Sequence, residues 1–431
     1  MTLRVDAHPS QKAAFTPAAP AAALEPGRRP YRWLILATMV LVFFSTYFIR
    51  LAWTNVSAST ARSLGSSASE LGLFFTFFYT GYVTTNVLGG LFVDRLGGRG
   101  VLILTFGAFA LATATFGLVS TPDEGLLTQL AMGAASGSFY AAIVKIVAPW
   151  FSERERGFAF SLIAMAGPFA IVIANLLYPV LIPRLGWNGL YEMLGIYAAA
   201  VTLITMLVVR EVGHSTARPG TRACSPSSPP PAPRLDRQLL LISAAGFGAS
   251  WGTYGFTFCS NLLLVKSHRF DAADAAIVAT LFGVGGTVAI PLYGLLSDRI
   301  ARHRPQMVIL GLLVFPAALA LFGVQSTLIG FSIAGFLLGI AAYAFWPLFS
   351  AMLADFMDHG RLGASAGIAN ASWQSANVVV PFVAGLIIDK TGSLAAALFS
   401  LALGPIFGAL CLVLLIREQA RTRRATFGEM S

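Results

Sequence analysis

Charged residues are scarce in this sequence. Of its 431 residues, 11% are Asp, Glu, Lys or Arg and 56% are hydrophobic, with a mean hydropathy of +0.73. A soluble domain carries about a quarter charged residues, so this composition excludes a soluble globular protein. Apolar blocks of about 20 residues recur along the whole chain, which is the pattern that transmembrane helices require.

Cysteine is rare, histidine is missing from the apolar blocks, and acidic residues are missing from their centres. Cys224, Cys259 and Cys411 lie far apart in sequence, so we infer neither a disulfide framework nor a metal site. All five histidines fall in predicted tails or loops. No predicted helix centre holds an acid of the kind that relays protons in pumps, and Glu192 lies near a helix edge. Because no nucleophile–base pair or metal cluster appears in the spans, we expect no enzyme and no cofactor.

The formal net charge of +10 does not indicate nucleic acid as a partner. The basic residues are scattered in short loops between apolar blocks, so we interpret them as topological charge beside a lipid bilayer. Residues 1–30 are polar and rich in Ala and Pro. They lack the basic start, apolar core and small-residue cleavage site of a signal peptide, so we expect the first helix to be retained.

The apolar blocks predict twelve transmembrane helices in an all-α membrane protein. The predicted helices lie at 32–58, 69–93, 99–119, 125–149, 157–183, 187–210, 238–265, 272–297, 306–324, 327–355, 362–388 and 393–416. The segment 211–237 is rich in Pro and Ser and has no apolar periodicity, which is typical of a flexible linker. We therefore expect bundles at 31–210 and 238–416, with a disordered tail at 1–30 and a second tail at 417–431.

The distribution of Lys and Arg predicts the orientation of the helices. If the N-terminus is cytoplasmic, 22 of the 29 basic residues lie in cytoplasmic segments and five in outer loops. Cytoplasmic loops are enriched in Lys and Arg. We therefore expect a multi-pass protein of the bacterial inner membrane, with both tails and the central linker in the cytoplasm.

Two pairs of segments repeat at nearly the same offset. GGLFVDRLGGRG at 89–100 matches YGLLSDRIARHR at 293–304, and their Asp–Arg pairs lie 204 positions apart. The segments 157–186 and 363–392 have equal length, begin and end with glycine, and are offset by 206. Two matches at one offset indicate duplicated six-helix halves.

Three features of the sequence resemble the major facilitator superfamily. They are the loop G-x-L-x-D-R-x-G-x-R, the second copy of this loop in the second half, and the central linker. The segment PWFSERERG at 149–157 is similar to one common in the organic-anion and sugar-phosphate branches. This resemblance implies a pseudo-symmetric fold with a central cavity and alternating access, in which the repeated loop is a cytoplasmic gate. The gate residues it implies are Gly90, Asp94, Arg95, Gly97, Arg99, Gly294, Asp298 and Arg299. The alternative is a basic loop that only fixes topology.

Arg50 is a charged residue near the end of the first predicted transmembrane helix, which is otherwise apolar. A charge in a membrane helix costs at least a few kcal/mol unless it faces water or a partner. Helical spacing puts Thr46 and Arg50 on one polar stripe with Thr54, flanked by Tyr47 and Trp53. Such a stripe favours a cavity-lining helix. The alternative is an arginine that snorkels to the outer interface, ~27 Å beyond Arg32 on a straight helix.

The segment YFIRLAWTNV resembles the helix 1 arginine segment of organophosphate and organic-anion transporters. That resemblance implies that Arg50 holds the anionic group of the substrate. Organophosphate transporters carry further basic residues, but the corresponding positions here are Asn86 and Thr253. A single cation suits a monoanion better than a dianionic phosphate.

Neutral polar and aromatic residues are expected to complete the substrate site. On the same helical faces we place Thr46, Tyr47, Trp53, Tyr79, Tyr82, Asn86, Tyr140, Tyr254, Asn261, Trp346, Asn370, Gln374 and Asn377. Any one of these Asn or Tyr side chains can alternatively hydrogen-bond between helices. The aromatics suggest an apolar wall suited to a carboxylate with an organic body.

We therefore predict a monomeric secondary active transporter for a small organic monoanion, a monocarboxylate. Proton symport, exchange of two anions and facilitated diffusion all fit the sequence. One alternative is a carrier of a neutral or sugar-like solute, in which Arg50 is structural. Another is a membrane sensor that binds without transport.

Overall fold

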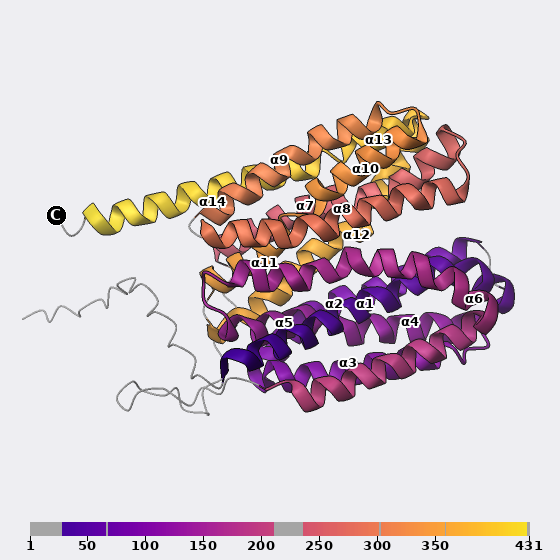
Figure 1. Cartoon of the computed structure of the whole chain (residues 1–431), viewed down its shortest axis with the longest axis horizontal. Helices are drawn as coiled ribbons and strands as arrows, with labels where there is room; N and C mark the ends of the chain where they lie inside the picture. The colour runs from indigo at the N-terminus through magenta and orange to yellow at the C-terminus, as the bar shows by residue number, and fades with distance from the viewer. Residues whose placement is uncertain (1–27, 66–67, 211–235, 301–302, 358, 429–431) are drawn as a thin grey trace, which may run out of the picture.

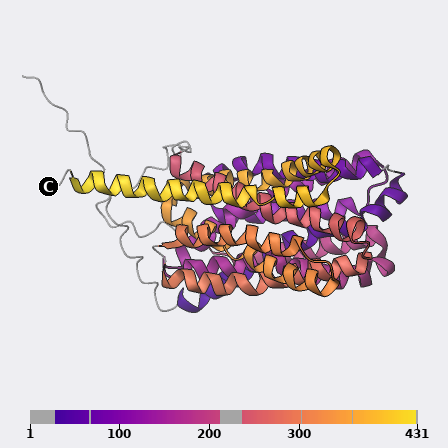
Figure 2. The same cartoon turned by 90° about the horizontal axis from the view of Figure 1, so that it is seen from above.

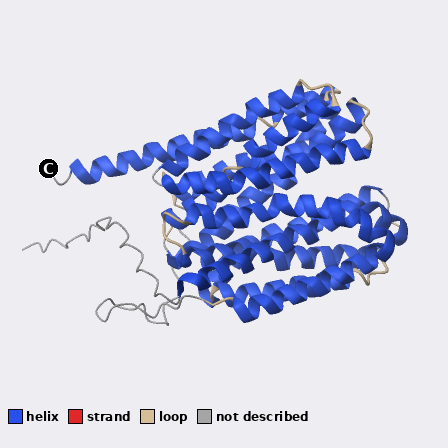
Figure 3. Cartoon of the chain, in the orientation of Figure 1, coloured by secondary structure: helices blue, strands red, loops and turns tan. Residues whose placement is uncertain are grey.

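The computed structural model describes residues 28–65, 68–210, 236–300, 303–357 and 359–428. Within these ranges the regular structure is helical, without a strand (Figure 3). The predicted N-terminal tail and central linker lie almost wholly outside the described residues, so the structure adds nothing to those two predictions.

Fourteen α-helices make up the described chain. In the first half they are α1 (Arg28–Leu64), α2 (Ala68–Leu96), α3 (Gly98–Phe116), α4 (Pro122–Ser136), α5 (Phe139–Val147) and α6 (Arg156–Val208). In the second half they are α7 (Arg237–Leu262), α8 (Ala272–Arg299), α9 (Arg304–Gly323), α10 (Leu328–Tyr343), α11 (Trp346–Phe356), α12 (Leu362–Thr391), α13 (Leu394–Ser400) and α14 (Leu403–Gly428). Short helical turns lie at Ala148–Trp150, Leu263–Ser267 and His359–Arg361.

These helices form the twelve membrane crossings that the sequence predicts. The pairs α4–α5, α10–α11 and α13–α14 each make one broken crossing. The helix α6 makes two, because Gly186 adopts a left-handed φ of 68° that interrupts it. Nine stretches of the described chain are long and apolar enough to cross a membrane, and α6 is one of them. With 29 and 26 residues, α2 and α7 have the length of a span.

The crossings form two bundles, α1–α6 and α7–α14, which lie side by side in Figure 1, whereas in Figure 2 the second bundle lies in front of the first. Tyr31 at the start of α1 donates to the carbonyl of Val208 at the end of α6, 2.5 Å away. Arg237 at the start of α7 pairs with Glu418 of α14 at 3.2 Å. All four ends therefore lie on one side of the molecule, which we call the tail side. The helix α14 projects beyond it to Gly428, past the predicted helix end at 416.

The duplication is visible in the packing of each bundle. A Cβ on Gly133 of α4 would lie 1.9 Å from the carbonyl oxygen of Phe78 in α2. In the second bundle, a Cβ on Gly339 of α10 would lie 2.0 Å from the carbonyl oxygen of Phe282 in α8. Both glycines permit the same close approach of helix backbones, which is a common packing mode in membranes.

Alanine at either glycine is expected to destabilise the protein by ~1–3 kcal/mol, because a helix must move to admit the methyl group. The melting temperature of purified Gly133→Ala and Gly339→Ala measures this effect. Gly385→Ala in α12 is the matched control, since its Cβ would meet no atom within 4 Å. An unchanged melting temperature for Gly133→Ala would contradict the packing described here.

The two bundles meet most closely along two helix pairs on the tail side. A Cβ on Gly90 of α2 would lie 2.5 Å from the carbonyl oxygen of Gly363 in α12. A Cβ on Gly294 of α8 would lie 2.8 Å from the carbonyl oxygen of Gly157 in α6. The repeated loop motif therefore supplies a glycine at each of these two helix contacts.

Candidate functional site

Arg50 lies inside the first bundle against two tyrosines. Its guanidinium carbon is 4.3 Å from the centre of the Tyr47 ring and 5.8 Å from that of Tyr79, so it faces aromatic rings. The side chain is half-buried. Within the described residues, the ion pairs found do not include Arg50. Arg50 is therefore a cation whose charge the described chain does not neutralise.

Phenol groups surround this cation. The rings of Tyr47 and Tyr79 face it directly, and the ring of Tyr82 lies 6.2 Å from that of Tyr79. Tyr47 of α1 and Tyr254 of α7 meet across the two bundles, with 3.3 Å between their hydroxyl oxygens. The hydroxyl oxygen of Tyr82 accepts hydrogen bonds from two side chains of α12, which leaves its own proton available to donate.

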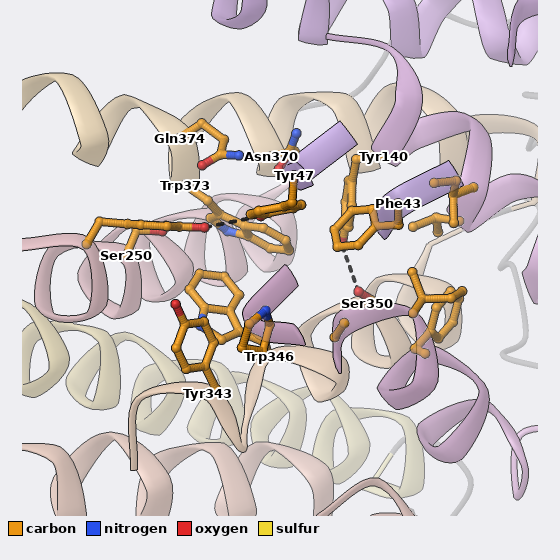
Figure 4. A pocket seen from close by; sticks show the side chains of 17 residues that line it. Phe43, Tyr47, Tyr140, Ser250, Tyr343, Trp346, Ser350, Asn370, Trp373 and Gln374 are labelled. Atoms are coloured by element: carbon orange, nitrogen blue, oxygen red, sulfur yellow. Dashed lines mark hydrogen bonds between the residues drawn. The ribbon is translucent and has the colours of Figure 1, made fainter. Parts of the chain in front are cut away.

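A cavity lies between the bundles next to Tyr47 and Tyr254 (Figure 4). Its wall is mainly apolar and aromatic, and consists of Phe43, Tyr47, Tyr140, Ile143, Val144, Phe160, Ile163, Ala164, Pro168, Ser250, Tyr254, Tyr343, Trp346, Ser350, Asn370, Trp373 and Gln374. The centres of water molecules can occupy about 70 Å³ of it. One water needs about 10–15 Å³, so several fit.

Arg50 does not line this cavity directly. The ring of Tyr47 lines the cavity and also carries the Arg50 guanidinium, so one aromatic ring separates the cation from the cavity. The sequence predicts that Arg50 faces the cavity, whereas the structure places it one ring away. The physical reason is that helical spacing fixes the direction of a Cα–Cβ bond, but not which of two neighbouring side chains covers the other.

Most polar side chains of the wall are already paired within the protein. The hydroxyls of Tyr140 and Ser350 lie 2.9 Å apart and link the two bundles (Figure 4). The amide nitrogen of Asn370 donates to Tyr82 at 3.0 Å and to Asn86 at 2.5 Å. These bonds fix the orientation of the side chains and use part of their hydrogen-bonding capacity.

The amide of Gln374 is also held on both sides. Its nitrogen donates to Tyr82 at 3.3 Å, and its oxygen accepts from Asn377 at 2.7 Å. The predicted stripe of Asn370, Gln374 and Asn377 on α12 therefore forms one connected network with α2.

The other sequence-predicted residues fall into three groups. Six of them line the cavity, namely Tyr47, Tyr140, Tyr254, Trp346, Asn370 and Gln374. Five are buried beside it without lining it, namely Thr46, Tyr79, Tyr82, Asn86 and Asn377. Trp53 stacks on Phe74 at 4.8 Å and packs away from the cavity, while the side chain of Asn261 lies outside the described residues.

The sequence interpretation missed several lining residues, chiefly Phe43, Ser250, Tyr343, Ser350 and Trp373. Helical spacing could have predicted Trp373 as a lining residue, because it lies on the same helical face as Asn370. Thr253, predicted to stand where related carriers have a cation, donates to the carbonyl of Ala342 at 3.1 Å and binds α7 to α10.

The tail side is closed by two carboxylates that cap helices of the opposite bundle. Asp94, at the end of α2, accepts from the backbone amides of Gly363 at 3.0 Å and Ala364 at 2.7 Å, in the first turn of α12. A carboxylate at a helix N-terminus is stabilised by the free amides and the helix dipole. Lys145 of α5 also donates to Asp94, at 2.6 Å.

Asp298, at the end of α8, makes the corresponding contact in the other direction. It accepts from the backbone amides of Gly157 and Phe158, both at 2.8 Å, in the first turn of α6. The two acidic residues of the repeated motif therefore each cap the helix that the other half provides.

A buried arginine joins Asp298 to a second acid. Arg304 is 1% exposed, pairs with Asp298 at 3.0 Å and also binds Asp355. Arg156 pairs with Asp355 at 3.1 Å. The sequence interpretation assigned no gate role to Arg304, because one basic residue in a loop looks the same as a topological charge.

The remaining predicted gate residues lie at the surface or shape the backbone. Arg95 and Arg299 are exposed, and Arg99 donates to the carbonyl of Met206 at 2.9 Å. Gly97 has a φ of 86°, which only glycine adopts readily, and it turns the chain from α2 into α3.

A further ion pair fixes the start of α1 to the turn before α6. Arg32 donates to Glu155 at 3.0 Å. Partial burial raises the pKa of Glu155, but hydrogen bonds from Arg32 and Ser152 outweigh it and leave the pKa below its ordinary value. A lowered carboxylate pKa stabilises the folded state above the unfolded pKa, and this contribution is lost as the pH falls through the folded value. The pair is therefore fully effective at neutral pH.

Comparison with known proteins gives one family. The family model described as Major Facilitator Superfamily matches residues 36–272 and 240–430. The probable sulfoacetate transporter SauU of Cupriavidus necator is 24% identical over 390 residues, covering 84% of this chain and 88% of that protein. The probable galactarate/D-glucarate transporter GudP of Escherichia coli is 23% identical, covering 90% and 94%.

Another relative and one solved structure agree with this result. The hexuronate transporter of Bacillus subtilis is 23% identical, covering 89% of this chain and 94% of that protein. The crystal structure of the human organic anion transporter MFSD10 (TETRAN) superimposes with a TM-score of 0.71. It is 18% identical and covers 90% of this chain and all of that chain, so it shows a shared fold.

Proposed function

The chain belongs to the Major Facilitator Superfamily and is a multi-pass membrane transporter, and we propose that it carries a small organic monoanion, a monocarboxylate. The single observation that carries this proposal is Arg50, a cation among phenols with no acidic partner in the described chain. The relatives named for sulfoacetate, glucarate and hexuronate support an organic acid as the substrate class.

The physical argument is a balance of charge. An arginine inside a membrane bundle costs at least a few kcal/mol unless a counter-charge or water compensates. A carboxylate bound beside Tyr47 and Tyr254 would supply one negative charge and accept hydrogen bonds from their hydroxyls. A dianion would bring a second charge for which the described cavity wall, with no Lys or Arg, offers no cation. This comparison favours a monoanion.

We further propose that the tail side is cytoplasmic and that the two capped helices form the inner gate. Alternating access requires the bundles to separate on this side, and both carboxylate caps must then release their helix N-termini. Because each cap consists of a few charge-assisted hydrogen bonds, it can break and re-form between two states.

Asp94→Asn is expected to weaken the first cap and shift the population of molecules toward a state open on the tail side. The amide keeps one acceptor but loses the charge that binds Lys145 and the N-terminus of α12, worth ~1–3 kcal/mol, which is a shift of roughly 5- to 150-fold. Spin-label distances between α2 and α12 measure the shift. Arg95→Gln, at an exposed neighbouring position, is the control, and equal distance distributions in all three proteins would refute the gate.

Uptake into proteoliposomes tests the transport proposal. We expect saturable uptake of labelled monocarboxylates, with and without a pH gradient across the membrane. Stimulation by an inward proton gradient would indicate symport, and a requirement for internal anion would indicate exchange. Uptake of neutral sugars alone, or binding without uptake, would overturn the proposed substrate class.

A further inference from the structure

The aromatic part of the cavity indicates what kind of organic body the anion carries. Rings from both bundles meet there at steep angles. Trp373 of α12 lies 5.6 Å from Tyr140 of α5, with 68° between the ring planes, and 5.8 Å from Trp346 of α11, with 64°. Phe43 of α1, which lines the same cavity, lies 5.1 Å from Tyr47. Figure 4 shows these rings around one space.

The position of Trp373 is fixed by its neighbour on α7. A Cβ on Gly246 would lie 2.0 Å from the indole nitrogen of Trp373, so this edge of the indole packs directly on the helix backbone. The residue is 3% exposed. Trp373 therefore gives the cavity a rigid aromatic face. The hydroxyls of Tyr47 and Tyr254, which lie beside Arg50, line the same cavity.

The wall is poorly suited to a polyhydroxylated acid. Each hydroxyl of such a molecule needs a hydrogen-bond partner once it leaves water. The amides of Asn370 and Gln374 and the hydroxyls of Tyr140 and Ser350 are bound within the protein. A flat ring needs no such partners, and aromatic neighbours stabilise it beyond the effect of burial.

Two buried polar atoms of the wall have no hydrogen-bond partner within the described chain, the hydroxyl of Ser250 and the indole nitrogen of Trp373, and the second packs against the backbone at Gly246. Ser250 is fully buried, and its hydroxyl has no hydrogen bond within the described chain. By contrast, Ser45 and Thr46 of α1 donate to the carbonyl one turn earlier, as helical hydroxyls commonly do. Ser250 lies one turn from Tyr254 on the same face of α7, about 6 Å along the helix. The cavity therefore has a second polar point on α7, separate from the Tyr47–Tyr254 hydroxyl pair.

We propose, resting on the transport function above, that the substrate is an aromatic monocarboxylate with an oxygen substituent opposite the carboxylate. The carboxylate binds at Tyr47 and Tyr254 beside Arg50. The ring lies in the cavity against the wall that Trp346, Trp373 and Tyr140 form. The distal oxygen pairs with the hydroxyl of Ser250.

Ligand-induced thermal stabilisation of the purified full chain tests directly whether the substrate is an aromatic monocarboxylate. The probes are 4-hydroxybenzoate, benzoate, cyclohexanecarboxylate and galactarate. We expect 4-hydroxybenzoate to bind at least ~10-fold more tightly than galactarate, with cyclohexanecarboxylate weaker than benzoate. Equal or tighter binding of galactarate or of the saturated ring would overturn the inference. Failure of every carboxylate to bind would instead overturn the proposed transport function, which keeps the two failures distinct.

Substitution of Trp373 tests the contact with the aromatic ring of the substrate. Trp373→Leu is expected to lower the affinity for benzoate ~10-fold, whereas Trp373→Phe, which retains a ring, recovers most of it. Trp187→Leu controls for the loss of a buried indole, since Trp187 is 6% exposed and does not line the cavity. Equal loss in Trp187→Leu and Trp373→Leu would refute the aromatic site.

Ser250→Ala is expected to lower the affinity for 4-hydroxybenzoate ~5-fold and to leave benzoate binding unchanged. Ser243→Ala is its control, because Ser243 of α7 is also buried and unpaired within the described chain but lies outside the cavity wall. If Ser250→Ala changes both ligands equally, the assignment of the distal oxygen is wrong.

Discussion

Arg50→Ala is expected to abolish anion uptake, with a loss of about 100-fold or more in the transport rate at low substrate concentration. The truncation removes the guanidinium that lies over the Tyr47 ring and leaves the substrate carboxylate among phenols alone. Because the Tyr47 ring lies between the guanidinium and the cavity, the lost interaction is charge attraction across that ring, which is roughly 2–4 kcal/mol for two opposite charges near the protein interior. Uptake of a labelled monocarboxylate into proteoliposomes measures the effect.

Arg50→Lys separates charge from shape. A lysine keeps the positive charge but lacks the flat guanidinium that stacks on Tyr47, so we expect intermediate uptake. Arg184→Ala, at an exposed position of α6, controls for the loss of any arginine. Wild-type uptake by Arg50→Ala would contradict both the proposed substrate class and the role of this residue.

Arg304→Ala is expected to have the largest effect on stability, because it leaves Asp298 and Asp355 buried without their shared cation. Breaking a buried ion pair by removing one partner typically costs 3–5 kcal/mol. Arg304 is 1% exposed, so water does not replace it readily. We expect a lower melting temperature and, in spin-label distances, separation of α8 from α6 on the tail side.

Arg304→Lys is the informative companion variant. A single ammonium lacks the planar fork that lets Arg304 reach Asp298, Asp355 and the carbonyl of Glu153 at the same time, so we expect partial rescue. Arg299→Ala, at an exposed position nearby, is the control. An unchanged melting temperature for Arg304→Ala would show that this network does not hold the tail side closed.

The elements that sequence predicts well are those set by local pattern. Apolar runs, breaks between them and the bias of basic residues depend on neighbours along the chain, and the twelve crossings follow from them. The repeat motif is equally visible, since Asp94 and Asp298 occupy matching positions. Family membership followed from the same motif and is confirmed by the family model.

The elements that sequence does not reveal depend on which surfaces meet. Phe43, Tyr343 and Trp373 lie in apolar helices, where an aromatic ring facing a cavity looks the same as one facing lipid. The charges of Arg156, Arg304 and Asp355 lie at the ends of separate helices, and only the packing of α6, α9 and α11 brings them together. The position of Arg50 behind Tyr47 depends on side-chain rotamers, which periodicity does not specify.

The reciprocal carboxylate caps have a further consequence for how this architecture arose. Asp94 binds Gly363 while Asp298 binds Gly157, and each residue has its sequence counterpart on the other side. This is the contact pattern of an isologous interface, in which two identical subunits meet about a two-fold axis. The surface between the bundles is thus equivalent to that of a homodimer whose subunits have been fused into one chain. After fusion the two copies can diverge. Asp94 now binds Lys145, whereas Asp298 binds Arg304, which also binds Asp355.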